Sequence, residues 1–408
     1  MIKNVKNLHQ APYLHFFALH LWYNNGVLRV SWNGKEEMEK LSQMQVKFLS
    51  TLKSGALLAL VVVLGVSLTS CGEDPSNKSA GEAGISGNFA ASGASSQKSA
   101  VDAWVASFGS ENPDAKISYD PKGSGGGRKD LGAGAVLFAG TDSPLKDQEI
   151  SDAATGGCQG GSAFEVPVYV SPIAVVFNLS GINSINLDAK TTAKIFSGAI
   201  TTWNDAAITA LNPGVTLPAT QITPVHRSDE SGTTENFTDY LSKASQGEWR
   251  FPKSGSWPID GGQSGKGSSG MSQIVNAAEG TIGYVDESQA GKLGKVSIGA
   301  DGVFVAPSAA EASKAVAASP IREGLKDGRV VVDIKRDLTA DQGYPLALIS
   351  YDAACTYYKD VNNSKFVKAW LKYITSEQGQ EVAHKETGSA PLPESLRTKI
   401  STSIDAIK

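Results

Sequence analysis

The sequence is poor in histidine and cysteine, with five of the first and three of the second among 408 residues. A structural metal site needs about four nitrogen or sulfur ligands at close spacing, and no such group occurs. After residue 70 only His226 and His384 remain, and no Gly-x-Ser-x-Gly elbow accompanies them. We interpret His226 as a strand-end side chain and not as a base. We therefore expect no metal, no cofactor and no enzymatic activity.

Positive charge is also scarce. The chain has 37 Lys and Arg against 41 Asp and Glu, and without residues 1–70 the balance becomes 30 against 38, a net charge of −8. A surface that binds nucleic acid or an anionic membrane wants the opposite sign, so we expect no nucleic-acid partner. Any anion that the protein binds must be held by a local site against an unfavourable overall field.

No apolar run is long enough to be a comfortable membrane helix. Lys53 precedes an apolar run at 55–68 that ends in small residues, which is typical of a secretory signal. The following Leu68-Thr69-Ser70-Cys71 resembles a bacterial lipobox, whose Cys is lipid-modified and becomes the first residue. The resemblance implies a lipoprotein carrying palmitate at Cys71, exported and anchored to the outer face of the cell membrane or to its periplasmic side.

A signal peptide starts close to its basic region, yet here 50 residues precede the apolar run. Residues 1–70 are therefore interpreted as a doubtful N-terminal extension plus the signal peptide, with Met38 or Met44 as the true start. Residues 71–86 are almost free of apolar side chains and predict a flexible tether.

Two cysteines, Cys158 and Cys355, remain once Cys71 carries lipid. An exported protein with two leftover cysteines most simply pairs them, so we expect a disulfide.

Beyond residue 87 the chain alternates between strand-like apolar runs and helical patterns, which predicts an α/β fold. Strands are predicted at 116–119, 135–139, 166–170, 173–177, 221–225 and 282–285, and a second long apolar run covers 344–351. Helices are predicted at 100–108, 128–133, 191–196, 203–211, from 232 onwards, and at 271–278, 309–318, 366–373 and 377–385.

Residues 226–237, His-Arg-Ser-Asp-Glu-Ser-Gly-Thr-Thr-Glu-Asn-Phe, predict the start of a helix capped by Ser231 or Thr233. Free N–H groups and the positive end of the helix dipole make such a start an anion site. Arg227 can clamp a tetrahedral oxyanion through two donors, and Asp229 can hold its guanidinium in place. An ordinary capped helix with a surface Arg-Asp pair explains the same residues, and this alternative stays open.

Similar loops occur earlier in the chain. Residues 92–96 precede a helical run, and 123–127, Gly-Ser-Gly-Gly-Gly, can bring backbone close to a ligand or serve as a linker. Asp142 follows a predicted strand, where ligands gather in open α/β sheets, although a turn-forming Asp fits as well. Residues 261–270 lack the spacing of a phosphate loop and are interpreted as a surface loop near the cleft.

Four of these segments occur together in the order and spacing of a known family. They are Gly93-Ala94-Ser95-Ser96, Gly123-Ser124-Gly125-Gly126, Thr141-Asp142-Ser143-Pro144-Leu145 and Arg227-Ser228-Asp229-Glu230-Ser231-Gly232-Thr233. Residues 195–204 and 280–285 add to the likeness. From about residue 85 to 400 the chain resembles the phosphate-binding proteins of bacterial phosphate ABC importers, the PstS family.

The resemblance implies a set of phosphate contacts braced by Asp229. The contacts fall on Ser95, Ser96, Ser124, Asp142, Arg227, Ser231, Gly232 and Thr233. Ser96 stands where some members have Phe, but the family's contact there is the backbone N–H. His226 replaces a basic neighbour found in some relatives, which weakens the local positive potential.

The family's fold is a two-lobe periplasmic-binding-protein-like fold of type II, with the ligand in the interlobe cleft. Lobe I would comprise 87–172 and 345–408, lobe II 173–344, and the crossings 166–177 and 344–351. The resemblance implies a monomeric solute-binding protein that captures inorganic phosphate and delivers it to the membrane permease subunits of an ABC importer. The alternatives are a binding protein for sulfate or molybdate and, more remotely, a secreted phosphatase acting through Ser231.

Overall fold

The computed structural model describes residues 20–24, 27–31 and 84–408. The chain divides into two compact units, Met1–Gly81 and Glu82–Lys408. In the first, β1 (His20–Asn24) pairs antiparallel with β2 (Val27–Ser31). The expected signal segment, its Cys71, both alternative starts and most of the tether lie outside the described residues. Within the described part of the chain, no helix combines the length and the apolar character that crossing a membrane requires.

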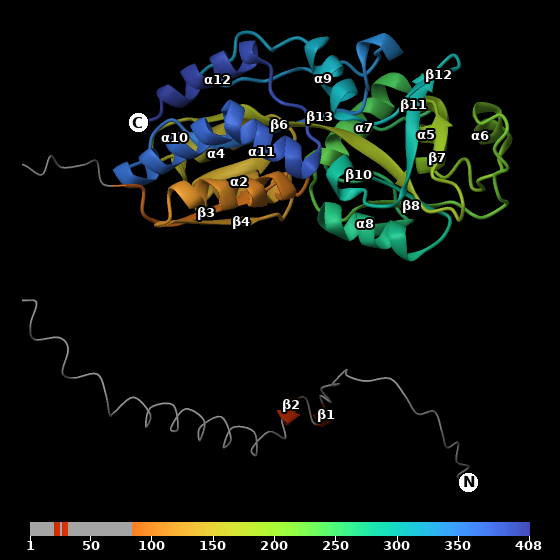
Figure 1. The fold of residues 1–408 in the computed structure, drawn as a ribbon, viewed down its shortest axis with the longest axis horizontal. Coiled ribbons are helices and arrows are strands. Elements are labelled where there is room, and N and C mark those ends of the chain that lie inside the picture. Colours follow the sequence, from red (N-terminus) through yellow and green to blue (C-terminus); the bar gives the residue numbers. More distant parts are fainter. Residues whose placement is uncertain (1–19, 25–26, 32–83) are drawn as a thin grey trace, which may run out of the picture. The chain divides into compact units, whose positions relative to one another are not determined.

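The second unit is built on one mixed sheet whose main path runs β4-β3-β5-β13-β6-β10-β8-β9, with β11 joining β6, β7 and β12 (Figure 1). Its strands are β3 (Gly87–Gly93), β4 (Ala115–Asp120), β5 (Phe138–Thr141), β6 (Ala163–Phe177), β7 (Ser184–Leu187), β8 (Thr223–Arg227), β9 (Gln263–Gly265), β10 (Thr281–Asp286), β11 (Gly294–Ala300), β12 (Val303–Val305) and β13 (Ala347–Cys355). We call the part on β3, β4, β5 and β13 lobe I, and the part on β7 to β12 lobe II.

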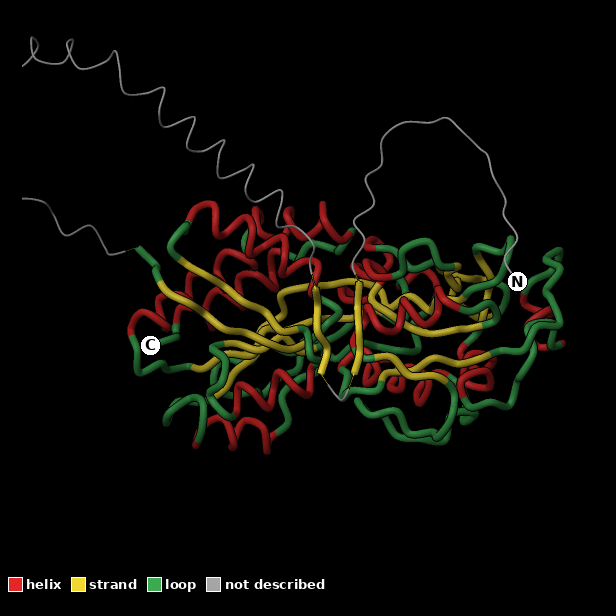
Figure 2. The backbone as a smooth tube through the Cα atoms, turned by 90° about the horizontal axis from the view of Figure 1, so that it is seen from below, coloured by secondary structure: helices red, strands yellow, loops and turns green. Residues whose placement is uncertain are grey.

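Helices flank the strands of both lobes (Figure 2). They are α2 (Lys98–Glu111), α3 (Ser124–Gly132), α4 (Asp147–Thr155), α5 (Ala189–Phe196), α6 (Ala206–Leu211), α7 (Gly232–Ala244), α8 (Gly267–Ala277), α9 (Ala309–Ala317), α10 (Val361–Thr375), α11 (Glu377–Thr387) and α12 (Glu394–Asp405), with single turns η1 (Glu287–Gln289) and η2 (Ala340–Gln342). The predicted α/β class and the two-lobe architecture are thus confirmed.

Strand β6 connects the lobes. Its first part pairs with β13 as far as Pro172, and its last part pairs with β10 from Ile173 onwards. The sequence predicted two strands here, at 166–170 and 173–177, which was wrong because the backbone stays extended through Ser171 and Pro172. Pro172 has no N–H to donate, and it lies where one partner strand gives way to the next, so the missing donor costs little.

Other boundaries also differ from prediction. Helix α3 begins at Ser124, inside the glycine run, and not at 128, because low helix propensity of glycine hides a start that tertiary contacts impose. Strand β5 begins at Phe138, later than predicted. The segment 261–270, predicted as a surface loop, contains β9 and the first turn of α8, where Ser268 is fully buried.

The core of lobe I is aromatic and is covered by α2 and α10. Trp104 of α2 is buried and its Nε1 donates to the carbonyl of Gly379 at 2.6 Å. Phe89 of β3 stacks on Phe366 of α10 with ring centroids 3.8 Å apart. Cys158 and Cys355 form the expected disulfide across a separation of 197 residues. These contacts tie the C-terminal helices to the first strands of the unit.

A buried carboxyl lies beside the crossing strand. Asp286 ends β10, and its Oδ1 accepts hydrogen bonds from Tyr169 Oη at 3.1 Å and from Ser288 Oγ at 2.6 Å. Ser171 of β6 donates to Oδ2. Burial raises the pKa of Asp286 from 3.8 to about 6, although these hydroxyls oppose the shift. Ionisation of Asp286 therefore lowers the stability of the folded protein relative to the unfolded chain.

We expect this cost to appear as a pH-dependent stability difference. Between about pH 4 and 6 the folded protein binds the Asp286 proton more tightly than the unfolded chain does, so stability falls as pH rises through that window. Urea unfolding should show Asp286→Asn gaining up to about 3 kcal/mol relative to wild type between pH 4 and 7. Asp260→Asn, at an exposed position, serves as the control. A pH-independent difference for Asp286→Asn would contradict the prediction.

Candidate oxyanion-binding site

The predicted site residues come from loops and helix starts that meet between the lobes. Ser95 and Ser96 follow β3, Ser124 opens α3, and Asp142 follows β5. On lobe II, Ser231 caps α7 by accepting a hydrogen bond from the Thr234 N–H at 3.2 Å. The positive ends of α3 and α7 therefore belong to one region, although their sequences are about 100 residues apart.

Asp142 is the centre of this region and is buried. Its Oδ1 accepts from Ser96 Oγ at 2.6 Å and from Ser350 Oγ at 2.8 Å, while Oδ2 accepts from Thr233 Oγ1 at 2.8 Å. Its backbone N–H donates to Ser124 Oγ at 3.1 Å. The carboxyl and the backbone N–H of Asp142 thus contact four separate segments: the loop after β3, the start of α3, the start of α7 and strand β13.

The environment of Asp142 opposes its ionisation. Burial raises the pKa of the carboxyl above its ordinary value, against the lowering effects of the three hydroxyl donors and of the Arg227 charge. A carboxylate offers about four acceptor positions, and three are filled by Ser96, Thr233 and Ser350. The position that remains is on Oδ2, beside Thr233, where a proton carried by a ligand can be accepted.

Arg227 lies at the end of β8 and is almost fully buried. Its Nε and Nη2 donate to Asp229 at 2.8 and 2.5 Å, and Asp229 Oδ1 also accepts from the Gly267 N–H at 3.1 Å. Burial raises the pKa of Asp229, but the Arg227 hydrogen bond and charge outweigh it and hold the pKa below its usual value. Among the described residues Nη1 of Arg227 has no hydrogen-bond partner, so this donor is available.

Glycines let the two lobes meet closely here. A Cβ on Gly232, the first residue of α7, would lie 2.6 Å from both the Asp142 Cβ and the Ser124 Oγ. A Cβ on Gly123 would lie 2.2 Å from Asp229 Oδ2. Because real Cβ atoms do not approach so closely, both positions require glycine in this arrangement. The structure therefore shows the lobes in contact across the site.

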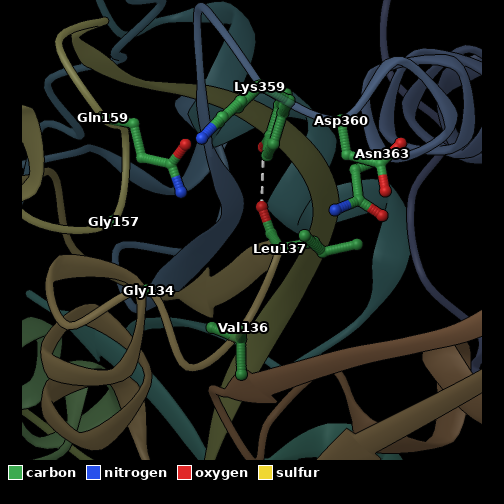
Figure 3. Close-up of a pocket in the computed structure, with 9 residues that line it drawn as sticks. Gly134, Val136, Leu137, Gly157, Gln159, Lys359, Asp360 and Asn363 are labelled. Carbon is green, nitrogen blue, oxygen red and sulfur yellow. Dashed lines mark hydrogen bonds between the residues drawn. The ribbon is translucent and has the colours of Figure 1, made fainter.

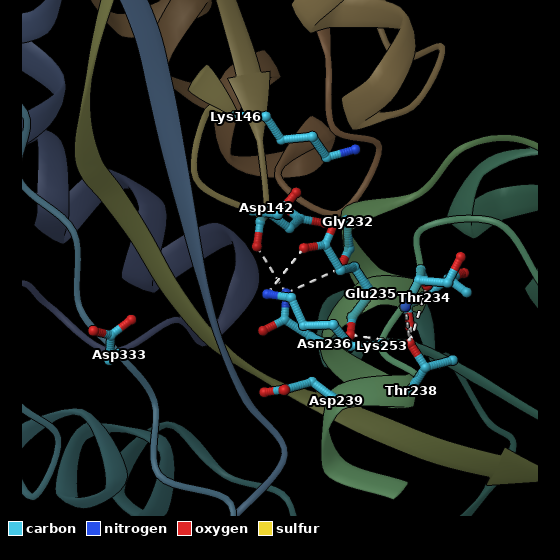
Figure 4. Close-up of polar contacts among 12 residues, drawn as sticks. Asp142, Lys146, Gly232, Thr234, Glu235, Asn236, Thr238, Asp239, Lys253 and Asp333 are labelled. Atoms are coloured by element: carbon cyan, nitrogen blue, oxygen red, sulfur yellow. Dashed lines mark hydrogen bonds and ion pairs between the residues drawn. The ribbon is translucent and has the colours of Figure 1, made fainter. Parts of the chain in front are cut away.

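Sequence reasoning missed three polar residues of this region. Ser268, in the first turn of α8, donates its N–H to Ser95 Oγ at 3.0 Å. Ser350 lies in the apolar strand β13, and its hydroxyl reaches Asp142. Asn236 of α7 donates to the Asp142 carbonyl at 2.7 Å (Figure 4). A lone Ser inside an apolar strand was the available signal for Ser350; Ser268 had only its Gly-Ser-Ser-Gly context.

His226 is held by contacts within lobe II. His226, at the end of β8, stacks on Trp257 with ring centroids 5.3 Å apart. Its ring nitrogens lie 3.0 and 3.1 Å from the carbonyls of Arg227 and Gly261. His226 is therefore a structural side chain at a strand end, as predicted. Within residues 84–408 and the short hairpin, no three His, Cys, Asp or Glu side chains are arranged to hold a metal ion.

A separate hollow of about 420 Å³ lies near the disulfide in lobe I (Figure 3). Its lining residues are Gly134, Val136, Leu137, Gly157, Gln159, Tyr358, Lys359, Asp360 and Asn363. None of them belongs to the predicted site, and the Tyr358 hydroxyl already donates a hydrogen bond to the Leu137 carbonyl at 2.6 Å. The Asp142 region, with its buried donors and braced guanidinium, is therefore the candidate site.

Taken together, the fold and the site define a solute-binding protein of the two-lobe periplasmic type. The family description PBP superfamily domain matches residues 78–378. The chain is 36% identical over 368 residues to Phosphate-binding protein PstS 3 of Mycobacterium leprae, covering 86% of this chain and 98% of that protein. It is 33% identical over 370 residues to Phosphate-binding protein PstS2 of Mycobacterium bovis BCG, covering 87% and 99%.

The chain belongs to the PstS family of phosphate-binding proteins. A solved structure supports the fold independently: a high-affinity periplasmic phosphate-binding protein, PfluDING, bound with phosphate, matches with a TM-score of 0.64. That match covers 78% of this chain and 93% of the other at 23% identity, so it shows the fold alone.

Proposed function

We propose that this protein captures inorganic phosphate between its lobes and delivers it to the permease subunits of an ABC importer. The observation that carries the proposal is the meeting of the braced Arg227, with Nη1 available, and the buried Asp142 carboxyl at the starts of α3 and α7. An oxyanion that still bears a proton needs both donors and one acceptor, and this set supplies both kinds.

The proposed contacts are those that the family resemblance indicates. They are Ser95, Ser96, Ser124, Asp142, Arg227, Ser231, Gly232 and Thr233, with Asp229 holding Arg227. Their convergence supports the assignment. We further propose lobe boundaries at 172/173 and 344/345. The change of pairing partner along β6 between Pro172 and Ile173 supports the first of these boundaries.

The proposal includes a place outside the cytoplasmic membrane, with Cys71 lipid-modified and residues 71–86 as the tether. The disulfide between Cys158 and Cys355 supports export, since such bonds persist in oxidising compartments. The protein acts as a monomer and catalyses no reaction. The Ser231 hydroxyl caps α7, and no base contacts it among the described residues, which favours binding over a phosphatase role.

Calorimetric titration of the purified protein with phosphate and then with sulfate tests the proposal. We expect saturable phosphate binding that EDTA does not change and no measurable sulfate heat at the same concentrations. At neutral pH phosphate keeps a proton for Asp142 to accept, whereas sulfate has none. Comparable affinity for sulfate would sink the phosphate assignment in favour of a general oxyanion binder.

A further inference from the structure

Glu230 extends from lobe II into a group of lobe I cations. Its Oε1 lies 3.1 Å from Arg128 Nη2 and 3.5 Å from Lys146 Nζ, and its Oε2 lies 3.3 Å from Lys129 Nζ. Its backbone carbonyl accepts from the Gly125 N–H at 3.1 Å. The contact therefore joins the segment between β8 and α7 to the first turns of α3 and to the residue before α4.

The Glu230 side chain packs against lobe I in addition to pairing with these cations. A Cβ on Gly125 would lie 2.4 Å from the Glu230 carboxyl carbon, so the side chain lies against bare helix backbone. Arg128 is 1% exposed and is held by Glu149 at 2.7 Å and by Thr141 at 2.9 Å. Burial raises the pKa of Glu230, but Arg128, Lys129 and Lys146 together hold it below the usual value.

The charge of Glu230 is unexpected at this place. It immediately precedes Ser231, and a carboxylate beside an anion site repels the anion by Coulomb's law. The site already includes two other carboxyl groups, Asp142 from lobe I and Asp229 from the same segment as Glu230. A carboxylate that repels the ligand and yet reaches into the opposite lobe must contribute something other than direct contact with the ligand.

We propose that Glu230 is an interlobe latch, a positioning residue that raises phosphate affinity by stabilising the closed arrangement of the lobes. The inference rests on the proposed phosphate site. A ligand that binds the closed form is held more tightly when that form is more populated, in proportion to the fraction closed. Lys129 and Lys146 are 78% and 59% exposed, so Arg128 carries most of the latch.

The test exploits two effects of opposite sign. Glu230→Gln removes a negative charge beside the site, which by electrostatics alone should tighten phosphate binding. Loss of the latch should weaken it instead, by about tenfold, a loss of the size seen for partly buried charge pairs. We expect the weakening to lie in the dissociation rate, measured by stopped-flow, because closure follows encounter. Raising the salt concentration to about 0.5 M should reduce the difference in phosphate affinity between Glu230→Gln and wild type, because salt screens the latch charges.

Glu235→Gln is the matched control. Glu235 is on the same helix start, but its partner is Lys253 of the same lobe at 3.2 Å, and both are labelled in Figure 4. This variant loses the same charge without loss of an interlobe contact, so its affinity should be unchanged or slightly higher. Glu230→Asp keeps the charge but withdraws it by one methylene, and it should fall between Glu230→Gln and wild type.

Each outcome decides a separate question. If wild type fails to bind phosphate in the titration, the proposed function is wrong. If wild type binds and Glu230→Gln binds equally well or more tightly, the latch is refuted while the function stands. A weaker Glu230→Gln whose loss lies in the association rate alone also refutes the latch, because closure is then unaffected.

Discussion

Replacing Arg227 by alanine should abolish tight binding of every oxyanion. In the proposed site Arg227 offers Nη1 to the ligand, while Asp229 accepts hydrogen bonds from the other two nitrogens of its guanidinium, and the side chain is nearly buried. Removing one member of a buried, charge-assisted contact costs about 2–5 kcal/mol, which predicts a loss of about one and a half to three and a half orders of magnitude in affinity. The variant also leaves Asp229 uncompensated beside the ligand. Titration calorimetry with phosphate measures the loss.

Two further variants separate the role of geometry from that of charge. Arg227→Lys keeps a positive charge but cannot contact Asp229 and the ligand through one planar fork, so its affinity should lie between those of wild type and Arg227→Ala. Arg250→Ala removes an equal charge from an exposed position and should bind as wild type does. Retention of near wild-type affinity by Arg227→Ala, with its thermal unfolding unchanged, would remove Arg227 from the site.

Asp142→Asn should collapse the discrimination between phosphate and sulfate. The wild-type carboxylate meets a fully ionised oxyanion lone pair to lone pair, and sites built on such hydrogen bonding reject the wrong ligand by factors on the order of 10⁴. An amide can turn a donor toward the ligand. We expect phosphate to bind about 10- to 100-fold more weakly and sulfate binding to become measurable, so that the gap narrows by two or more orders of magnitude.

The control for this variant is another buried aspartate. Asp286→Asn removes a carboxylate that also accepts hydrogen bonds from hydroxyl groups, but its donors are Tyr169, Ser171 and Ser288, none of which is a predicted phosphate contact. Its phosphate-to-sulfate ratio should equal that of wild type. If Asp142→Asn keeps the full wild-type ratio in paired titrations, discrimination comes from elsewhere in the site. Ser96, Thr233 and Ser350 would then be the next residues to vary, since they donate to the same carboxyl.

Local chemistry made much of the site visible in the sequence. The cap at Ser231, the Arg227-Asp229 pair and the Asp142 position after a strand each follow from rules that act over a few residues. These are the residues that the structure brings together. The family resemblance assigns these residues to one site from the sequence alone, because four short motifs in a fixed order are a far stronger signal than one.

What the sequence did not reveal depends on contacts between distant segments. Ser268 reaches Ser95 across 173 residues, and Ser350 reaches Asp142 across 208, so no local pattern could pair them. The start of α3 was placed four residues late because glycine is a poor helix former in isolation. The sequence predicted two strands in place of β6 because Pro172 interrupts the apolar pattern. Proline ends a strand only where the sheet needs a backbone N–H donor at that position, and none is needed at Pro172.

The place of β13 has a consequence for the order in which the chain is made. This strand lies between β5 and β6, yet it is synthesised about 170 residues after β6 ends. Until residues 347–355 emerge, the nascent polypeptide has two unsatisfied sheet edges facing each other across a gap, and such edges invite pairing with other chains. Lobe II is built from one intervening stretch, and its last strand, β12, ends at Val305, before β13 begins. A polypeptide truncated anywhere before β13 would therefore be prone to aggregation and proteolysis.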